Sequence, residues 1–258
     1  IYMMDKKPLI LIANDDGYRA KGFHKLIELM RKLGEVIAIS TEKPMSGQSH
    51  SITNHDPLRV YLAEQDADYK LYVCSGRPVD CIKIGYRFTD GRMPDLVVSG
   101  INHGSNASSN VIYSGTMGAA LEACMDGVPA IGFSVDSYSS NAEFDHIECY
   151  VDAIARRVLA EGLPKGVCLN VNMPKKSEEA INGVKICRQA KGRWSQTFEH
   201  RVDPFGRDYY WLTGYFIEED EGVDTDLYAI KNNYIAVVPT MFDMTSYSSM
   251  EILKDWNL

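Results

Sequence analysis

Two adjacent carboxylates stand near the start of the chain, in the segment Asn14-Asp15-Asp16-Gly17. Neighbouring side chains of an extended strand point to opposite faces, so Asp15 and Asp16 converge only where the chain turns. Asn14 and Gly17 tolerate such a turn. Two convergent carboxylates repel each other unless a cation lies between them, and oxygen ligands suit Mg²⁺, Mn²⁺ or Ca²⁺. The segment predicts a metal site, although an exposed turn that caps a helix explains the tetrapeptide equally well by itself.

Two other loops could add neutral oxygen ligands. Residues 99–106, with the sequence SGINHGSN, directly follow an expected strand, and Asn102 offers an amide oxygen to a hard cation. Taken alone, Asn102 is better explained as a loop residue that hydrogen-bonds nearby backbone. Residues 44–51 could provide one hydroxyl, and physical reasoning leaves Ser46, Ser49 and Ser51 equally suitable.

A phosphate site is predicted where Tyr113-Ser114-Gly115-Thr116 opens a helix. Free backbone amides at a helix N-terminus, with the helix dipole behind them, bind anions readily. A plain helix cap formed by Ser114 is the alternative, and it is compatible with phosphate binding.

The elements that position these loops alternate between strand and helix. A short apolar run that is hydrophobic throughout is typical of a strand buried on both faces of a parallel sheet. The pattern predicts a doubly wound, mainly parallel, Rossmann-like α/β sheet, whose ligand sites lie at the carboxyl ends of the strands. We expect strands at residues 8–13, 35–39, 70–74, 95–98, 130–135 and 167–171, and helices at about 23–33, 78–88, 116–125 and 144–161.

The alternation of expected strands and helices ends after Pro174. Aromatic segments at residues 209–212 and 215–217 predict a hairpin that turns at Thr213-Gly214 and stands off the main sheet. Such a hairpin is marginal alone in water, so we expect it to pack on another subunit, with folding back onto its own domain as the alternative. The whole chain, 1–258, is then one domain in which residues of about 175–230 form a hairpin-bearing extension.

Composition limits the partners. The net charge of -8 and the pI of about 5.3 oppose binding to polymeric nucleic acid but permit a small phosphorylated ligand. The six cysteines include no C-x-x-C pair, which favours reduced, mostly buried thiols. No apolar run approaches the roughly 20 residues that span a bilayer and no segment resembles a signal peptide, so we expect a cytoplasmic protein without a membrane partner.

Taken together, the four loops resemble the SurE family of survival-protein nucleotidases. The matching segments are NDDG, SG with HSIT, PDLVVSGINHGSN and YSGTMGAALEA. Further similarities are Gly76, Pro78, Asp80 and Cys81 to the family's GTPADC segment, and RW at 193–194, PFG at 204–206, YYW at 209–211 and TD at 225–226. Several linked motifs in order are far more specific than any one of them.

The resemblance implies a divalent-metal-dependent phosphatase of nucleoside 5′- and 3′-monophosphates, a phosphoric monoester hydrolase; some family members also shorten polyphosphate. It implies one ion per subunit, Mg²⁺ or Mn²⁺ with Ca²⁺ as another occupant, and a homodimer or homotetramer in which the late hairpin is exchanged. The implied metal ligands are Asp15, Asp16, Ser46 and Asn102, of which Asp15, Asp16 and Asn102 are the catalytic set. The residues implied near the phosphate are Asn106, Ser114, Gly115 and Thr116.

Three residues depart from the family pattern. Ser40-Thr41 replaces Ala-Pro after the second strand, and Arg77 replaces the Thr of GTPADC. None of the three coincides with a matched ligand, so we expect them to affect loop shape and substrate preference more than activity.

The expected mechanism is in-line attack on phosphorus by a water associated with the metal, with Asp15 or Asp16 taking the proton. His50 and His103 lie in the site loops but are more simply explained as solvated or structural residues. The alternative function is a sensor that binds metal and nucleotide without turnover. A nicotinamide oxidoreductase is disfavoured because the first loop lacks G-x-G-x-x-G, and zinc-peptidase and esterase motifs are absent.

Overall fold

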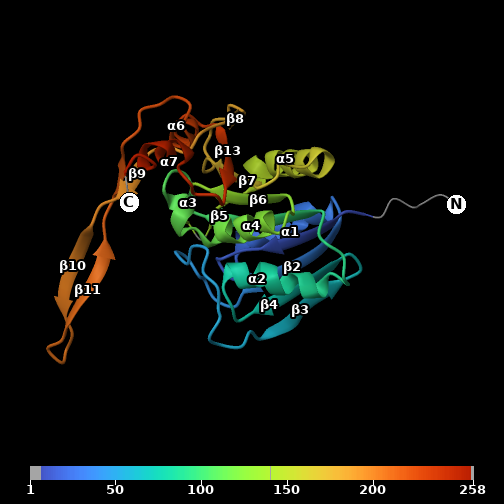
Figure 1. The fold of residues 1–258 in the computed structure, drawn as a ribbon. Helices are drawn as coiled ribbons and strands as arrows, with labels where there is room; N and C mark the ends of the chain where they lie inside the picture. The colour runs from blue at the N-terminus through green and yellow to red at the C-terminus, as the bar shows by residue number, and fades with distance from the viewer. Residues whose placement is uncertain (1–6, 140, 257–258) are drawn as a thin grey trace.

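The main sheet of the protein contains nine strands in the order β3-β4-β2-β1-β5-β6-β7-β13-β8 (Figure 1). It is seen in a computed structural model that describes residues 7–139 and 141–256. Most neighbours run parallel, while β3 is antiparallel to β4 and β13 is antiparallel to β7. The sheet strands are β1 (Leu9–Ala13), β2 (Glu35–Thr41), β3 (Val60–Asp66), β4 (Tyr69–Cys74), β5 (Leu96–His103), β6 (Ala130–Val135), β7 (Val167–Met173), β8 (Val184–Ile186) and β13 (Ile235–Met241).

Helices cover both faces of this sheet, so the predicted doubly wound α/β class is confirmed. Along β1, Ile10 and Ile12 join the core that contains α1 and α5, while Leu9 and Leu11 join the core that contains α2 and α4. This alternation follows from the period of two of a strand, and it explains why the whole run is apolar. The helices are α1 (Lys21–Arg31), α2 (Pro78–Gly85), α3 (Asn110–Tyr113), α4 (Gly115–Met125), α5 (Glu148–Glu161), α6 (Asp226–Lys231) and α7 (Tyr247–Leu253), with 3₁₀ turns η1 (Tyr86–Phe88) and η2 (Asp145–Ile147).

The six predicted strands and four predicted helices are all present, with small differences at their ends. The expected helix from Pro78 to Phe88 divides into α2 and η1, and β5 continues to His103 rather than ending at Val98. Strand β3 was missed, because six of its seven residues are exposed and no apolar alternation marks it. As an edge strand it needs only one hydrogen-bonded neighbour, β4.

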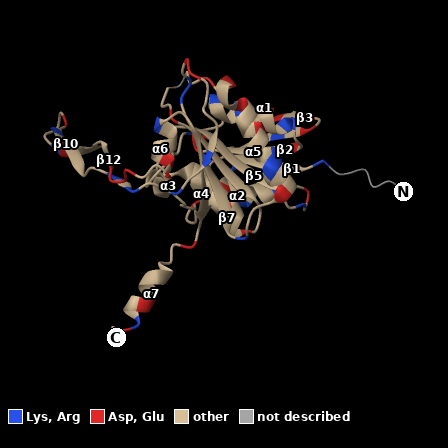
Figure 2. Cartoon of the chain, turned by 90° about the horizontal axis from the view of Figure 1, so that it is seen from above, with Lys and Arg blue, Asp and Glu red and all other residues tan. Residues whose placement is uncertain are grey.

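Two small antiparallel sheets form an arm, residues 192–218, which stands away from the body (Figure 1). Strand β9 (Gly192–Trp194) pairs with β12 (Phe216–Glu218) at the root of the arm. Beyond them, β10 (Thr197–Val202) pairs with β11 (Asp208–Thr213). Figure 2 shows that α7 also leaves the body, in a different direction from the arm.

The predicted pairing within the arm was wrong. The segments at 209–212 and 215–217 do not pair across Thr213-Gly214, because Tyr210 lies opposite His200 and Phe216 lies opposite Trp194. The true turn is residues 203–207, where the Asp203 carboxylate accepts the amides of Phe205 and Arg207 at 2.8 and 3.0 Å. The Asp-Pro-Phe-Gly sequence there is typical of a turn, so the sequence does contain a signal for the true position of the hairpin.

All six cysteines are free thiols, and all except Cys149 are buried, as expected. Among the helices of residues 7–139 and 141–256, none combines the length and the apolar composition that crossing a bilayer requires.

Candidate metal and phosphate site

The acidic pair lies immediately beyond β1, where the chain leaves the extended state. The Asn14 side chain fixes this turn, since its Nδ2 donates to the Gly17 carbonyl at 3.0 Å while its Oδ1 accepts the Ser40 hydroxyl. Gly17 has a φ of 86°, a backbone conformation that a residue with a Cβ rarely adopts. The turn therefore presents two consecutive carboxylates at the carboxyl edge of the sheet.

Asp15 is buried and faces the first turn of α4. The Thr116 hydroxyl donates to its Oδ1 at 2.6 Å. Burial raises the pKa of Asp15 to about 6, the negative charge of Asp16 adds to this rise, and hydrogen bonds from Thr116 oppose it. A Cβ built on Gly115 would lie only 2.9 Å from the Asp15 carboxylate, so glycine is what permits this approach.

Asp16 is held from the opposite side, by the loop after β5. The backbone amide of His103 donates to its Oδ2 at 2.9 Å. Burial raises the pKa of Asp16, and this amide opposes the rise. Two carboxylates whose pKa values are both raised by burial form a site that a cation would relieve.

Asn102 and Ser46 lie on segments tied to this pair. The Asn102 Nδ2 donates to the Gly104 carbonyl at 2.7 Å, so its Oδ1 is the atom left to accept or to ligate. Ser46 is exposed, and the amide of the preceding Met45 donates to the Asp15 carbonyl at 2.6 Å. The three alternatives in this loop now differ, because the hydroxyls of Ser49 and Ser51 donate to the carbonyls of Ile112 and Gln48, both at 2.6 Å.

Helix α4 begins where the anion site is predicted. The Ser114 hydroxyl accepts the Met117 amide at 3.0 Å, an N-cap that leaves the amides of Gly115 and Thr116 at the open end of the helix. That end faces Asp15, so a phosphate bound there would lie beside the carboxylates rather than apart from them.

Asn106 belongs to a buried amide network. Its backbone amide donates to Asn172 at 2.7 Å and its side-chain Nδ2 donates to the Ser134 hydroxyl at 2.8 Å. Asn170 in turn donates to the Asn106 carbonyl at 2.9 Å. Sequence reasoning did not single out Asn170, Asn172 or Ser134, although two asparagines at alternate positions of an apolar strand were a usable signal.

Asp226 joins the same loop to the root of the arm. Its buried carboxylate accepts the Ser108 amide at 2.8 Å and the Ala190 amide at 2.9 Å. Nearby, the Trp194 indole donates to Asn110 at 2.7 Å. The segment between Asn106 and Ser114 is thus fixed partly by residues that lie more than 80 positions later.

Comparison with known proteins gives this geometry a family. Residues 10–196 match the family described as Survival protein SurE. The chain belongs to the SurE family. It is similar to the 5′-nucleotidase SurE of Christiangramia forsetii, with 50% identity over 99% of each chain, and to that of Flavobacterium psychrophilum, with 49% identity over 98% of each.

A solved relative also agrees with the fold. The crystal structure of the SurE protein from Aquifex aeolicus superposes with a TM-score of 0.82 at 35% identity, covering 96% of this chain and 98% of that one. The resemblance inferred from the linked motifs is therefore confirmed.

The departures from the SurE pattern lie close to the site without replacing its main groups. The Ser40 hydroxyl, absent from an alanine, bonds to Asn14 and so supports the turn that carries Asp15. Arg77 donates from Nη1 to the Ile52 carbonyl at 2.8 Å and begins α2. Both residues thus contact neighbouring segments, and their effect on substrate preference stays a prediction.

The two histidines of the SurE loops act differently from each other. The His50 ring contacts the Glu122 carboxylate at 2.7 Å, and Lys83 pairs with the same buried group. His103 serves Asp16 through its backbone amide, whereas its ring contacts the Ser139 carbonyl at 3.0 Å. Neither contact requires the imidazole to act on a substrate.

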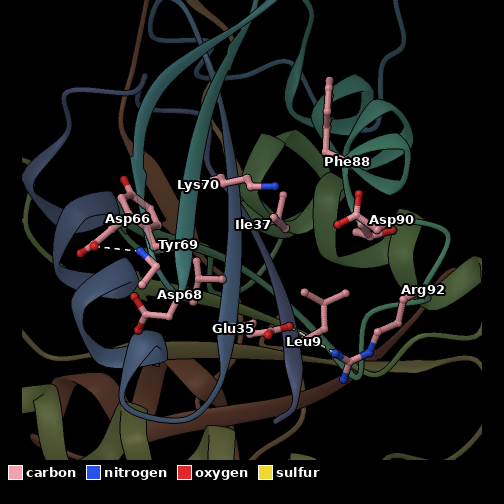
Figure 3. Close-up of a pocket in the computed structure, with 13 residues that line it drawn as sticks. Leu9, Glu35, Ile37, Asp66, Asp68, Tyr69, Lys70, Phe88, Asp90 and Arg92 are labelled. Carbon is pink, nitrogen blue, oxygen red and sulfur yellow. Dashed lines mark hydrogen bonds and ion pairs between the residues drawn. The ribbon is translucent and has the colours of Figure 1, made fainter. Parts of the chain in front are cut away.

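Two hollows lie at opposite ends of the strands of the main sheet. One, of about 510 Å³, has Asp16 in its wall and opens beside the acidic turn. The other, of about 200 Å³, lies where β1, β2 and β4 begin (Figure 3). Within it Arg92 pairs with Glu35, while Asp66 and Asp68 pair with Arg31 outside its lining. It lies at the amino ends of these strands, away from the acidic pair. The larger hollow is the one that adjoins the candidate chemistry.

Proposed function

We propose that this chain is a divalent-metal-dependent phosphatase that hydrolyses nucleoside 5′-monophosphates, and also 3′-monophosphates and short polyphosphate. One observation carries the proposal. Asp15 and Asp16 follow β1 directly and lie beside the N-terminus of α4. The Thr116 hydroxyl of α4 donates to Asp15, and the His103 amide donates to Asp16. Paired carboxylates next to an anion-binding helix end suit a phosphate ester and a cation at once.

The side chains at the site fit such an ion. Asp15, Asp16, Ser46 and Asn102 would offer two charged and two neutral oxygen ligands, which suits one Mg²⁺ or Mn²⁺ per subunit, with Ca²⁺ as an occupant. The fit rests on two features. Burial, with the charge of Asp16 adding to it, raises the pKa of Asp15, and the Asn102 side-chain nitrogen is already bonded to the Gly104 carbonyl, which leaves the amide oxygen to ligate. When bound, the ion would polarise a phosphoryl oxygen and stabilise the charge that develops there.

The chain's own groups then bind, orient and move protons. The α4 amides of Gly115 and Thr116, with Ser114 and Asn106 nearby, would hold the phosphate. A water attacks phosphorus in line with the ester oxygen, so that one P–O bond forms as the other breaks. Asp15 or Asp16 takes the water's proton, and the departing ester oxygen takes a proton from solvent to give the alcohol. Thr116 holds Asp15 in one orientation for this step.

Phosphate release tests the proposal. Nucleoside 5′- and 3′-monophosphates and polyphosphate would be incubated with the protein after EDTA treatment, then with Mg²⁺, Mn²⁺ or Ca²⁺ added back. We expect release of inorganic phosphate that EDTA abolishes and a metal restores. Tight nucleotide binding without any phosphate release would instead favour the metal- and nucleotide-binding sensor.

We also propose that the protein is a cytoplasmic homodimer or homotetramer, one domain whose extension at about 175–230 joins the subunits. Support comes from the aromatic side chains that the arm exposes, because large exposed apolar patches usually mark interfaces. The most exposed of them are Phe205, Tyr215, Tyr210, Phe198 and Trp211.

A further inference from the structure

The antiparallel direction of β3 brings an aromatic ring to the carboxyl edge of the sheet, where Asp15 and Asp16 lie. Strands β1, β2, β4, β5, β6 and β7 run parallel and end at that edge. Strand β3 begins there, because Val60 lies opposite Cys74 and Tyr61 lies opposite Val73 near the end of β4. Tyr61 is 50% exposed. An aromatic side chain so placed contributes little to the core, and its exposed face is free to contact a ligand.

Tyr61 forms one wall of the hollow beside Asp16. The other walls are residues 16–20 of the acidic turn and residues 42–44 of the loop after β2. The volume, about 510 Å³, falls within the roughly 300–1,000 Å³ usual for small-molecule sites. Because Asp16 belongs both to this wall and to the proposed metal site, a molecule whose phosphate lies at the carboxylates has its remaining part next to the hollow.

The two tyrosines of the hollow differ in availability. Tyr18 is engaged by Arg19, whose guanidinium lies 5.1 Å from the ring centroid and whose Nε donates to the Tyr18 hydroxyl at 2.9 Å. For Tyr61, by contrast, the described residues include no aromatic or cationic stacking partner. Tyr61 is therefore the ring that a planar ligand can cover.

We propose that this hollow receives the nucleoside half of the substrate and that the base stacks on Tyr61. The inference rests on the proposed function and deepens it. Every base has a π-face, so stacking alone holds purines and pyrimidines alike. Stacking on Tyr61 therefore favours substrates that carry a base over sugar phosphates that lack one.

Substrates with and without a base provide the test. For Tyr61→Ala we expect the KM for adenosine 5′-monophosphate to rise about 10-fold or more, in line with the loss of one base-stacking contact. Its kcat should stay within about twofold, because no group at the carboxylates changes. Ribose 5-phosphate should show no change in either constant. Tyr61→Phe, which keeps the ring, should restore the parent KM.

Leu62→Ala is the matched control, because Leu62 is the next residue of β3, similarly exposed, and does not line the hollow. It should leave both substrates unaffected. An equal rise in KM for the nucleotide and for ribose 5-phosphate in Tyr61→Ala, or no rise for either, overturns the inference.

Calorimetry of adenosine 5′-monophosphate and ribose 5-phosphate binding in Ca²⁺ separates this inference from the proposed function. If the parent protein releases no phosphate, the phosphatase proposal fails. A selective loss of nucleotide affinity in Tyr61→Ala would still support the stacking site, and unchanged affinity would reject it.

Discussion

The carboxyl edge of the sheet, where Asp15 and Asp16 lie, and the arm are built in opposite ways. At the edge, Asp15, Asn14 and Thr116 are buried and each bonds to a residue of another loop or helix. In the arm, every residue of β10 and β11 is exposed, and the two strands pair only with each other. Contacts between distant segments determine the first region, whereas the second is formed by backbone and side-chain contacts between two strands that are close in sequence.

The difference indicates where each region finds its stability. A two-stranded hairpin is marginal in water by itself, so we expect the apolar side chains of the arm to pack on another subunit, as proposed above. At the edge, by contrast, Asn14, Asp15 and Asp16 are all held by hydrogen bonds from other parts of the same chain. Changes at the edge should therefore alter turnover without altering assembly, and changes in the arm should do the reverse.

The largest effect is expected from the acidic pair. Asp15→Asn or Asp16→Asn removes a charge from the proposed cation site but little from the core, so kcat should fall at least about 1,000-fold, with circular dichroism and mass in solution unchanged. Ser46→Ala should be milder, since a neutral hydroxyl holds a cation less strongly. Full activity in either aspartate variant would remove the assignment of the metal site.

A smaller loss is expected from Gly115→Ala. The new Cβ would lie 2.9 Å from the Asp15 carboxylate and 3.0 Å from the Pro78 ring, so the carboxylate must move, and a misplacement of this size costs about 100-fold in kcat. Gly127→Ala, at the other end of α4, is the control. It meets no atom within 4 Å but has a φ of 79°, so it should lower Tm while kcat stays intact. Equal kcat losses in both variants would mean that helix strain, not the Asp15 contact, is responsible.

A stability effect that depends on pH is expected from Glu122→Gln. Burial tends to raise the Glu122 pKa, but Lys83 and His50 outweigh it, and the net pKa lies below the ordinary value of 4.5. A carboxylate with a lowered folded-state pKa adds stability above its unfolded-state pKa and loses it as pH falls through the folded value. At pH 7 the variant should lose about 1–3 kcal/mol, and the difference should shrink below pH 4.5.

Thermal unfolding at several pH values measures this difference. Glu161→Gln is the control, because its pair with Arg157 is exposed on both sides and should contribute little. A Glu122→Gln deficit that persists unchanged at low pH would show that the lost contact is steric rather than ionic.

The smallest effect on the body is expected from removing the arm tip. Residues 198–212 would be replaced by a short Gly-Ser turn between Thr197 and Thr213, which already lie opposite each other. The mass in light scattering should fall toward that of a monomer, and Tm should change little, because no core residue is lost. If the shortened protein keeps the parent's mass, another surface joins the subunits.

Sequence was most informative where burial and chemistry occur together. The apolar run of β1 and the carboxylates after it predicted both the strand and the site edge, because a short, wholly apolar run is typical of a strand covered on both faces. Strand β3 escaped prediction because its exposed residues carry no such constraint. The pairing in the arm escaped because two adjacent aromatic strands suggested each other as partners, whereas the turn at 203–207 decided the register.

Contacts distant in sequence could not be predicted in the same way. Asp226 meets Ser108 across 118 residues, and Asn172 meets Asn106 across 66. No local pattern encodes which polar group finds which once the sheet has formed. The motif TD at 225–226 was noticed by resemblance, but its role as a hydrogen-bonding bridge appears only in three dimensions.

Asp226 connects the root of the arm to the loop that precedes α4. Its carboxylate accepts hydrogen bonds from the amides of Ser108 and Ala190. At the root of the arm, the Trp194 indole donates to the Asn110 side chain. If subunits assemble through the arm as proposed, contacts at its tip are connected to this loop by these few hydrogen bonds. The direction in which a partner holds the arm would then bias the position of the loop that precedes α4.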